Sequence, residues 1–89
     1  MAEYLVELYV SRSDGAAAER GGRQARLAAE QLTREGTPVR YLRSIFVPDD
    51  ETCFYLYEAA SADAVREAAR RASLPSERVI EAITRPTGR

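Results

Sequence analysis

The chain has 89 residues and a formal net charge of −1, which suits one small globular domain, residues 1–89, with a limited hydrophobic core. This charge gives nucleic acid and anionic membranes little to attract, and no apolar run approaches the roughly 20 residues that span a bilayer. One cysteine cannot form an internal disulfide, so we expect a cytoplasmic protein.

Several residue types are missing from the sequence. It contains no His, Lys, Asn or Trp, and all thirteen basic residues are Arg. These absences exclude histidine-based catalytic triads and lysine Schiff bases, and they remove the commonest ligand of zinc and nickel. Acid–base chemistry would depend on Glu, Asp, Tyr or Cys53. We expect no cofactor.

The first third of the chain predicts a strand followed by a helix. Residues 3–10 alternate between two sets of side chains with a period of two, as a β-strand does. Residues 16–35 are rich in Ala, Arg, Glu, Gln and Leu, which favour a helix. Gly21 and Gly22 interrupt that composition, so we expect a firm helix only from about residue 22 onward.

The remainder predicts three strands and a second helix. Residues 39–47 and 52–58 form two strands joined by an acidic turn. Ser61 is a helix N-cap, and the helix that it begins ends before Pro75. Residues 78–84 form the last strand.

The order of these elements predicts the fold class. Strand, helix, two strands, helix and strand form a split βαβ arrangement. Right-handed crossovers place the strands in the order four, one, three, two, with both helices on one face. We therefore expect an α+β, ferredoxin-like βαββαβ sandwich with a four-stranded antiparallel sheet. Its other face, called the open face below, carries no helix.

Alternation along the strands sorts the side chains between the two faces. Side chains expected to meet the helices are Tyr4, Val6, Leu8, Val10, Leu42, Ser44, Phe46, Phe54, Leu56, Ile80 and Ala82. Side chains expected on the open face are Leu5, Glu7, Tyr9, Tyr41, Arg43, Ile45, Val47, Cys53, Tyr55, Tyr57, Val79, Glu81 and Ile83.

An open face with so many apolar groups predicts an interface. The simplest is a homodimer that pairs two sheets. A small-molecule pocket between those sheets is the alternative, and its expected lining is Glu7, Tyr9, Tyr41, Arg43, Tyr55, Tyr57 and Glu81. Within it we expect Glu7, Arg43 and Glu81 to form a polar cluster.

Several segments resemble a family of small bacterial proteins of unknown function, some of whose members are described as nickel-binding or nickel-responsive. They are YLVE at 4–7, YLRS at 41–44, YEA at 57–59, VREAARR at 65–71 and LPSERVIE at 74–81. The resemblance implies a dimeric protein with the same ferredoxin-like fold.

The nickel site of that family does not transfer to this chain. The resemblance implies histidines at the positions of Arg43 and Ala68, and neither side chain binds a cation. Glu7 and Glu81 match the family pattern, but late transition metals favour imidazole and thiolate over carboxylate. We expect no metal site, or at most weak binding of a divalent ion such as nickel.

Three functions remain to be compared. The first is a dimeric binding protein, without catalysis, in which Arg43 grips an anionic or carbonyl-bearing ligand or pairs with a glutamate. The second is a cofactor-free enzyme of the dimeric ferredoxin-like type with Glu7 or Glu81 as its base, which is an analogy of fold. RNA binding is disfavoured, because the aromatic third strand lacks the basic and glycine residues of RNA-recognition modules.

Overall fold

The computed structural model describes residues 1–83. Its elements are β1 (Ala2–Tyr9), α1 (Gly15–Arg34), β2 (Val39–Val47), the 3-10 turn η1 (Pro48–Asp50), β3 (Thr52–Ala59), α2 (Ala62–Arg71) and β4 (Val79–Ala82). The sheet is antiparallel with the order β2-β3-β1-β4, which confirms the predicted ferredoxin-like fold. Thr84, the last residue of the expected fourth strand, lies outside the described residues.

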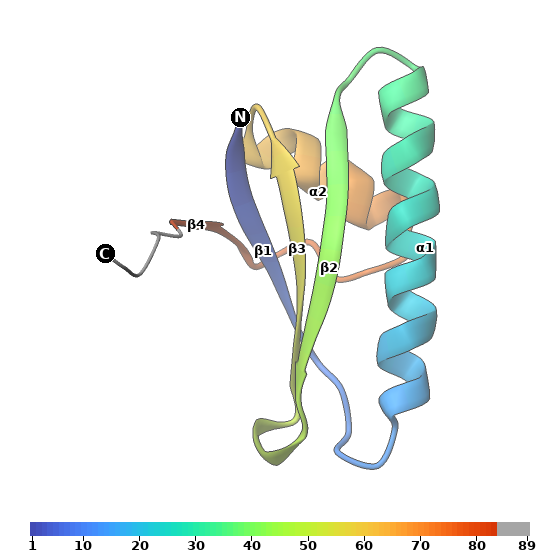
Figure 1. The fold of residues 1–89 in the computed structure, drawn as a ribbon, viewed down its shortest axis with the longest axis vertical. Helices are drawn as coiled ribbons and strands as arrows, with labels where there is room; N and C mark the ends of the chain where they lie inside the picture. Colours follow the sequence, from blue (N-terminus) through green and yellow to red (C-terminus); the bar gives the residue numbers. More distant parts are fainter. Residues whose placement is uncertain (84–89) are drawn as a thin grey trace, which may run out of the picture.

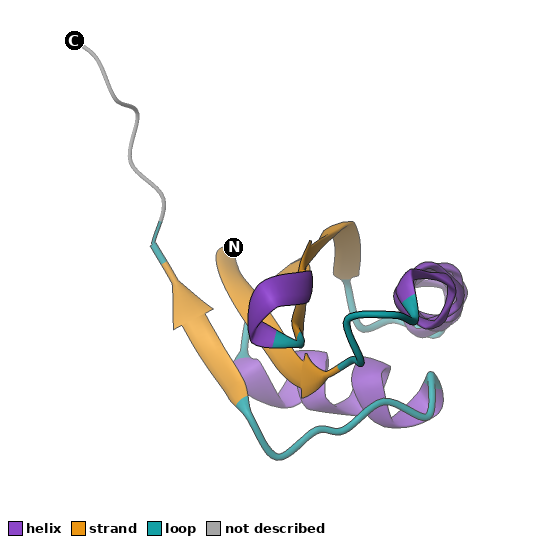
Figure 2. Ribbon diagram, turned by 90° about the horizontal axis from the view of Figure 1, so that it is seen from below, coloured by secondary structure: helices purple, strands orange, loops and turns teal. Residues whose placement is uncertain are grey.

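The two helices lie on one side of the sheet. In Figure 1, α1 runs beside β2 and α2 crosses behind the strands. Figure 2 views α1 end-on, with β4 at the opposite edge of the sheet. Side chains from both helices and from β1, β2 and β3 form one hydrophobic core, and no helix of residues 1–83 covers the other face of the sheet.

Helix α1 is continuous through both glycines, and the expected break at Gly21 and Gly22 is wrong. Asp14 caps its first turn, where the Asp14 carboxylate accepts a hydrogen bond of 3.2 Å from the Ala17 N–H. The helix ends in a Schellman motif: the N–H of Thr37 donates to the carbonyl of Leu32. Gly36 supplies the left-handed residue of this motif with a φ of +110°.

The glycine pair allows α1 to pack closely against the sheet. A Cβ atom at Gly21 would overlap the hydroxyl oxygen of Tyr55, and one at Gly22 would lie 2.8 Å from the hydroxyl oxygen of Tyr41. Real Cβ atoms do not come this close to other atoms. The glycines therefore form a notch in α1, and the tips of two tyrosines occupy it.

Strand pairing explains why the tyrosines face the helices. Residues directly opposite each other in an antiparallel pair share a face. Tyr55 lies opposite Val6, and Tyr57 lies opposite Tyr4. Because Val6 and Tyr4 are buried under the helices as predicted, Tyr55 and Tyr57 must lie there too.

A β-bulge in β2 brings Tyr41 to the same face. The register between β2 and β3 shifts between Tyr41 and Arg43, so Leu42 is an extra residue without a partner. Tyr41 therefore lies on the helix side together with Ser44, although the two are three residues apart. Arg43 remains on the open face, as predicted.

These pairings correct the expected distribution of side chains. Residues expected on the open face that lie on the helix side are Tyr41, Cys53, Tyr55, Tyr57, Val79 and Glu81. Residues expected in the core that lie on the open face are Phe54, Leu56, Ile80 and Ala82. The cause is that β3 and β4 carry apolar side chains on both faces, so alternation alone does not orient them.

Replacing Gly21 with Ala should lower the free energy of unfolding by about 1 to 3 kcal/mol, because the added methyl group meets the Tyr55 hydroxyl. Ala is otherwise the better helix former by about 1 kcal/mol. Gly15→Ala is the control, since a Cβ there meets only a Phe46 ring carbon at 3.9 Å. Urea unfolding followed by circular dichroism measures both variants. Equal stability of Gly21→Ala and Gly15→Ala would contradict the notch.

Candidate functional site

The residues expected to line a single site are divided between the two faces of the sheet. Those on the open face are Glu7, Tyr9 and Arg43. Those on the helix side are Tyr41, Tyr55, Tyr57 and Glu81. The sheet separates the two sets, so one chain does not assemble the expected pocket.

The three helix-side tyrosines form a packed aromatic cluster. The Tyr41 ring lies 6.1 Å from the Tyr55 ring and 5.7 Å from the Tyr57 ring, the latter in an edge-on arrangement. The Tyr55 hydroxyl donates a hydrogen bond of 2.8 Å to the Ala18 carbonyl of α1. The buried Tyr57 hydroxyl has no hydrogen-bond partner within residues 1–83.

Burial keeps the polar groups of this cluster protonated. Burial raises the pKa of the Tyr55 and Tyr57 hydroxyls well above their usual value. It also raises the pKa of the Cys53 thiol, which has no exposed surface. A protonated, buried thiol is neither a nucleophile nor a metal ligand. The cluster is thus part of the hydrophobic core.

Glu7 has a different partner from the expected one. Its carboxylate accepts a hydrogen bond of 2.7 Å from Nε of Arg78, and its N–H donates to the Arg78 carbonyl at 3.3 Å. Glu81 lies opposite Tyr4 and therefore on the other face of the sheet. The predicted cluster of Glu7, Arg43 and Glu81 is wrong, because the register of β4 turns Glu81 away.

The surroundings of Glu7 are polar. A hollow of about 270 Å³ beside it is lined by residues that include Tyr9, Glu51 and Arg78. The Tyr9 hydroxyl donates a hydrogen bond of 3.3 Å to the Glu51 carboxylate. Glu7 thus lies in a polar hollow and is already paired with Arg78.

The open face carries an apolar patch in the middle of the sheet. One row of paired residues runs Arg43, Leu56, Leu5 and Ile80 across the four strands, and the next holds Ile45 and Phe54 beside Glu7. We define the open-face patch as Leu5, Ile45, Phe54, Leu56 and Ile80. Ile45 and Ile80 are 41% and 37% exposed, Leu5 and Phe54 are half-buried, and Leu56 is buried, so a partner would reach the patch mainly through the two isoleucines.

The described residues contain no group of three or more His, Cys, Asp or Glu side chains that could hold a metal ion. The two positions at which the resemblance implies histidines also differ in burial and lie on opposite sides of the sheet. Ala68 is fully buried in the core on α2, whereas Arg43 is exposed on the open face. Within one chain, the sheet lies between them.

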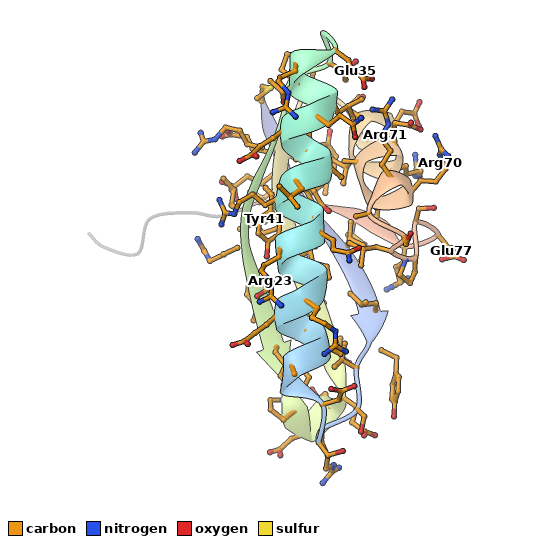
Figure 3. All side chains as sticks on the ribbon, turned by 90° about the vertical axis from the view of Figure 1, so that its right-hand side faces the viewer. Arg23, Glu35, Tyr41, Arg70, Arg71 and Glu77 are labelled. Carbon is orange, nitrogen blue, oxygen red and sulfur yellow. The ribbon has the colours of Figure 1, made fainter. Side chains whose placement is uncertain are left out.

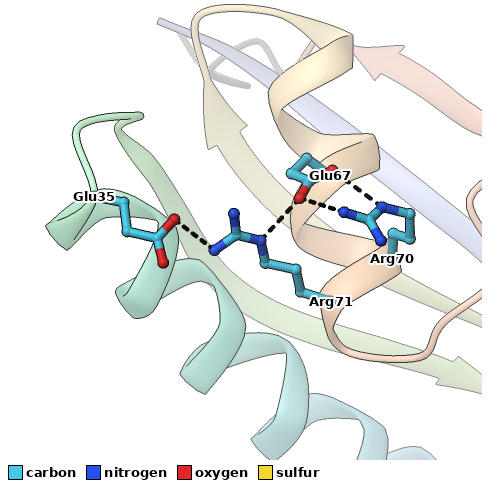
Figure 4. A network of polar contacts seen from close by, with 4 residues as sticks. All are labelled: Glu35, Glu67, Arg70 and Arg71. Carbon is cyan, nitrogen blue, oxygen red and sulfur yellow. Dashed lines mark hydrogen bonds and ion pairs between the residues drawn. The ribbon is translucent and has the colours of Figure 1, made fainter.

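A network of charges joins the two helices. The Arg71 guanidinium bridges Glu67 on α2 at 2.9 Å and Glu35 at the end of α1 at 2.8 Å, and Arg70 also binds Glu67 (Figure 4). The hydrogen bonds from Arg70 and Arg71 lower the pKa of the Glu67 carboxyl. The network lies at the surface, so it links the two helices but contributes little to stability.

A basic hollow that sequence reasoning missed lies between α1 and the edge strand β2. It has a volume of about 410 Å³, and its lining includes Arg26, Arg34, Arg40 and Tyr41. The Arg26 guanidinium carbon stands 5.3 Å from the centre of the Tyr41 ring. The arginine spacing on α1 was visible in the sequence, but the bulge that turns Tyr41 toward α1 was not.

Comparison with known proteins gives one family and one structure. The family model described as "Nickel responsive protein SCO4226-like" matches residues 4–82. The crystal structure of SCO4226 from Streptomyces coelicolor A3(2) superimposes with a TM-score of 0.70 at 21% identity, covering 96% of this chain and 100% of that chain. At this identity the likeness shows the fold. A comparison with curated proteins gives no match.

Residues 1–83 contain two α-helices, α1 and α2. Neither α1 nor α2 is both long enough and apolar enough to cross a membrane.

Replacing Tyr55 and Tyr57 with Phe should have different effects on stability. Tyr55→Phe loses the hydrogen bond to Ala18 and should lower the free energy of unfolding by about 1 kcal/mol. Tyr57→Phe removes a buried hydroxyl that has no partner in the described chain, so stability should be unchanged or higher. Urea denaturation measures both, and an equal loss in Tyr57→Phe would mean that its hydroxyl is bonded.

Proposed function

Because this chain belongs to the SCO4226-like family of nickel-responsive proteins, we propose its role as that of a member without a tight nickel site. It acts as a homodimeric binding protein that pairs two sheets through their open faces. The observation that carries this proposal is the open-face patch. This patch gives the chain a place to bind a second copy. The described residues contain no cluster of metal ligands.

The layout of the open face supports self-association. Apolar side chains hold the centre of the sheet, and charged pairs lie at its margins, Arg40 with Glu58 at 3.1 Å and Glu7 with Arg78 at 2.7 Å. An apolar core within a polar rim is the usual anatomy of a protein interface. Two copies related by a two-fold axis would each cover the other's patch, as an isologous dimer requires.

Arg43 implies that the interface also contains an anionic group. It lies in the row of Leu56, Leu5 and Ile80, and no ion pair within residues 1–83 involves it. A guanidinium that becomes buried needs an anion beside it. In the dimer this anion is a carboxylate of the second copy or of a bound small molecule, and a ligand there would meet Arg43, Glu7 and Tyr9.

Nickel does not fit the groups that this chain offers. The sequence has no His, and the one thiol, Cys53, is buried with a raised pKa. Surface carboxylates that are not clustered bind late transition metals weakly. The proposed function is therefore independent of nickel. No observation favours an enzyme with a Glu7 base, because Glu7 is already paired with Arg78.

Ile45→Glu should convert the dimer to monomers, because a carboxylate would have to be buried within the interface. Ile45 is 41% exposed in the single chain, so the fold should tolerate the change. Leu27→Glu is the matched control: Leu27 is 64% exposed on α1, away from the open face, and that variant should remain dimeric. Sedimentation velocity at micromolar concentration measures both.

The dimer proposal fails if the unaltered protein sediments as a monomer under those conditions. It also fails if Ile45→Glu remains dimeric, or if Leu27→Glu alone dissociates, since the interface would then lie on the helices.

Calorimetric titration of the untagged, chelator-treated protein with nickel should give a dissociation constant weaker than about 10 μM, because imidazole is absent and the thiol is buried. Cys53→Ala should leave the titration unchanged. Tight binding that this substitution abolishes would contradict the account and would require Cys53 to leave the core.

A further inference from the structure

The hollow between α1 and β2 continues along the helix. Next to the space bounded by Arg26, Arg34 and Arg40 lies a second hollow of about 360 Å³, which shares Arg26 and Tyr41 and adds Arg23. We call the two together the α1–β2 groove. Figure 3 views α1 from outside, with Tyr41 and Arg23 on the side of the helix along which β2 runs.

The groove is locally cationic. Its lining holds four guanidinium groups against two carboxylates, Glu19 and Glu30, in a protein whose net charge is −1. Glu30 lies four residues from both Arg26 and Arg34, a spacing that permits helical ion pairs. Among the described residues neither pair forms, and the ion pair of Arg40 is with Glu58, which does not line the groove.

The walls of the groove are held in place before any ligand arrives. Arg26 stands over the Tyr41 ring in a cation–π contact. The Thr33 hydroxyl accepts a hydrogen bond of 3.0 Å from the Val39 N–H and donates one of 2.8 Å to the Val39 carbonyl. The backbone of Val39 on the edge strand is thereby satisfied. Val39 and Ala29 are almost fully buried and give the groove an apolar base.

From this arrangement we propose that the α1–β2 groove binds a small organic anion, in which a phosphate or carboxylate is attached to a flat apolar body. The planar forks of Arg26 and Arg34 suit bidentate contacts with such oxygens. The body would lie beside the edge of the Tyr41 ring, whose face Arg26 covers, and above the apolar base of the groove. Arg40 lies both in the groove lining and at the margin of the open face, but Arg26, Arg34 and Tyr41 do not, so ligand binding should not require dimerisation.

The test is a titration of the 15N-labelled full chain followed by NMR with three probes: phenyl phosphate, benzoate and inorganic phosphate. Phenyl phosphate or benzoate should shift the amide signals of Tyr41 and Val39 and saturate with a dissociation constant of about 1 mM or tighter. Inorganic phosphate, which lacks the flat body, should bind more weakly. The stronger of the two aromatic probes identifies the preferred anion.

The double variant Arg26→Gln with Arg34→Gln should weaken binding at least about tenfold, the effect of losing two charge-assisted contacts. The control is Arg66→Gln with Arg70→Gln, which removes the same charge from the exposed face of α2 and should bind as the unaltered protein does. Ile45→Glu should also bind normally, which separates this site from the dimer.

Two results would overturn the proposal. One is an equal loss of affinity in the two arginine double variants, which would mean that the probes respond to overall charge. The other is the absence of saturation by any probe up to about 10 mM at constant ionic strength, which would mean that the arginines attract only a diffuse counterion atmosphere.

Discussion

The contact between two tyrosine tips and the glycine notch in α1 determines how the rest of the molecule is arranged. Tyr55 and Tyr41 reach Gly21 and Gly22 only if their strands turn these side chains toward the helices. Once Tyr55 faces α1, the period-two geometry of β3 sends Phe54 and Leu56 to the other side of the sheet. The apolar character of the open face is therefore a consequence of how the core is filled.

The same contact separates the surfaces that are available for function. The open face keeps the exposed Arg43 among aliphatic and aromatic side chains, a composition suited to a second copy of the chain. On the other side of the sheet, Tyr41 forms a wall of the α1–β2 groove and holds Arg26 by its ring face. The chain belongs to a nickel-responsive family, but its described residues contain no cluster of metal ligands.

The sequence predicted the elements, their order and the sheet topology, because composition, caps and right-handed crossovers fix these locally. It predicted the faces of β1 correctly, since only one side of that strand is entirely apolar. The faces of β3 and β4 were not predictable from alternation, and the bulge at Leu42 has no local signature that would have placed Tyr41. One signal was available: Gly21 and Gly22 within a helical segment mark a close approach, and large side chains such as Tyr55 were the candidates to fill it.

A double-mutant cycle between Gly21→Ala and Tyr55→Phe tests the central contact most directly. If the tyrosine hydroxyl occupies the notch, removing it should relieve most of the damage caused by the added methyl group, although that methyl would still lie 3.0 Å from the ring carbon Cζ. The account predicts a coupling free energy of about 1 kcal/mol or more from urea unfolding of the four proteins. Effects that add to within about 0.3 kcal/mol would show that the two residues do not touch, and would contradict the assignment of the faces.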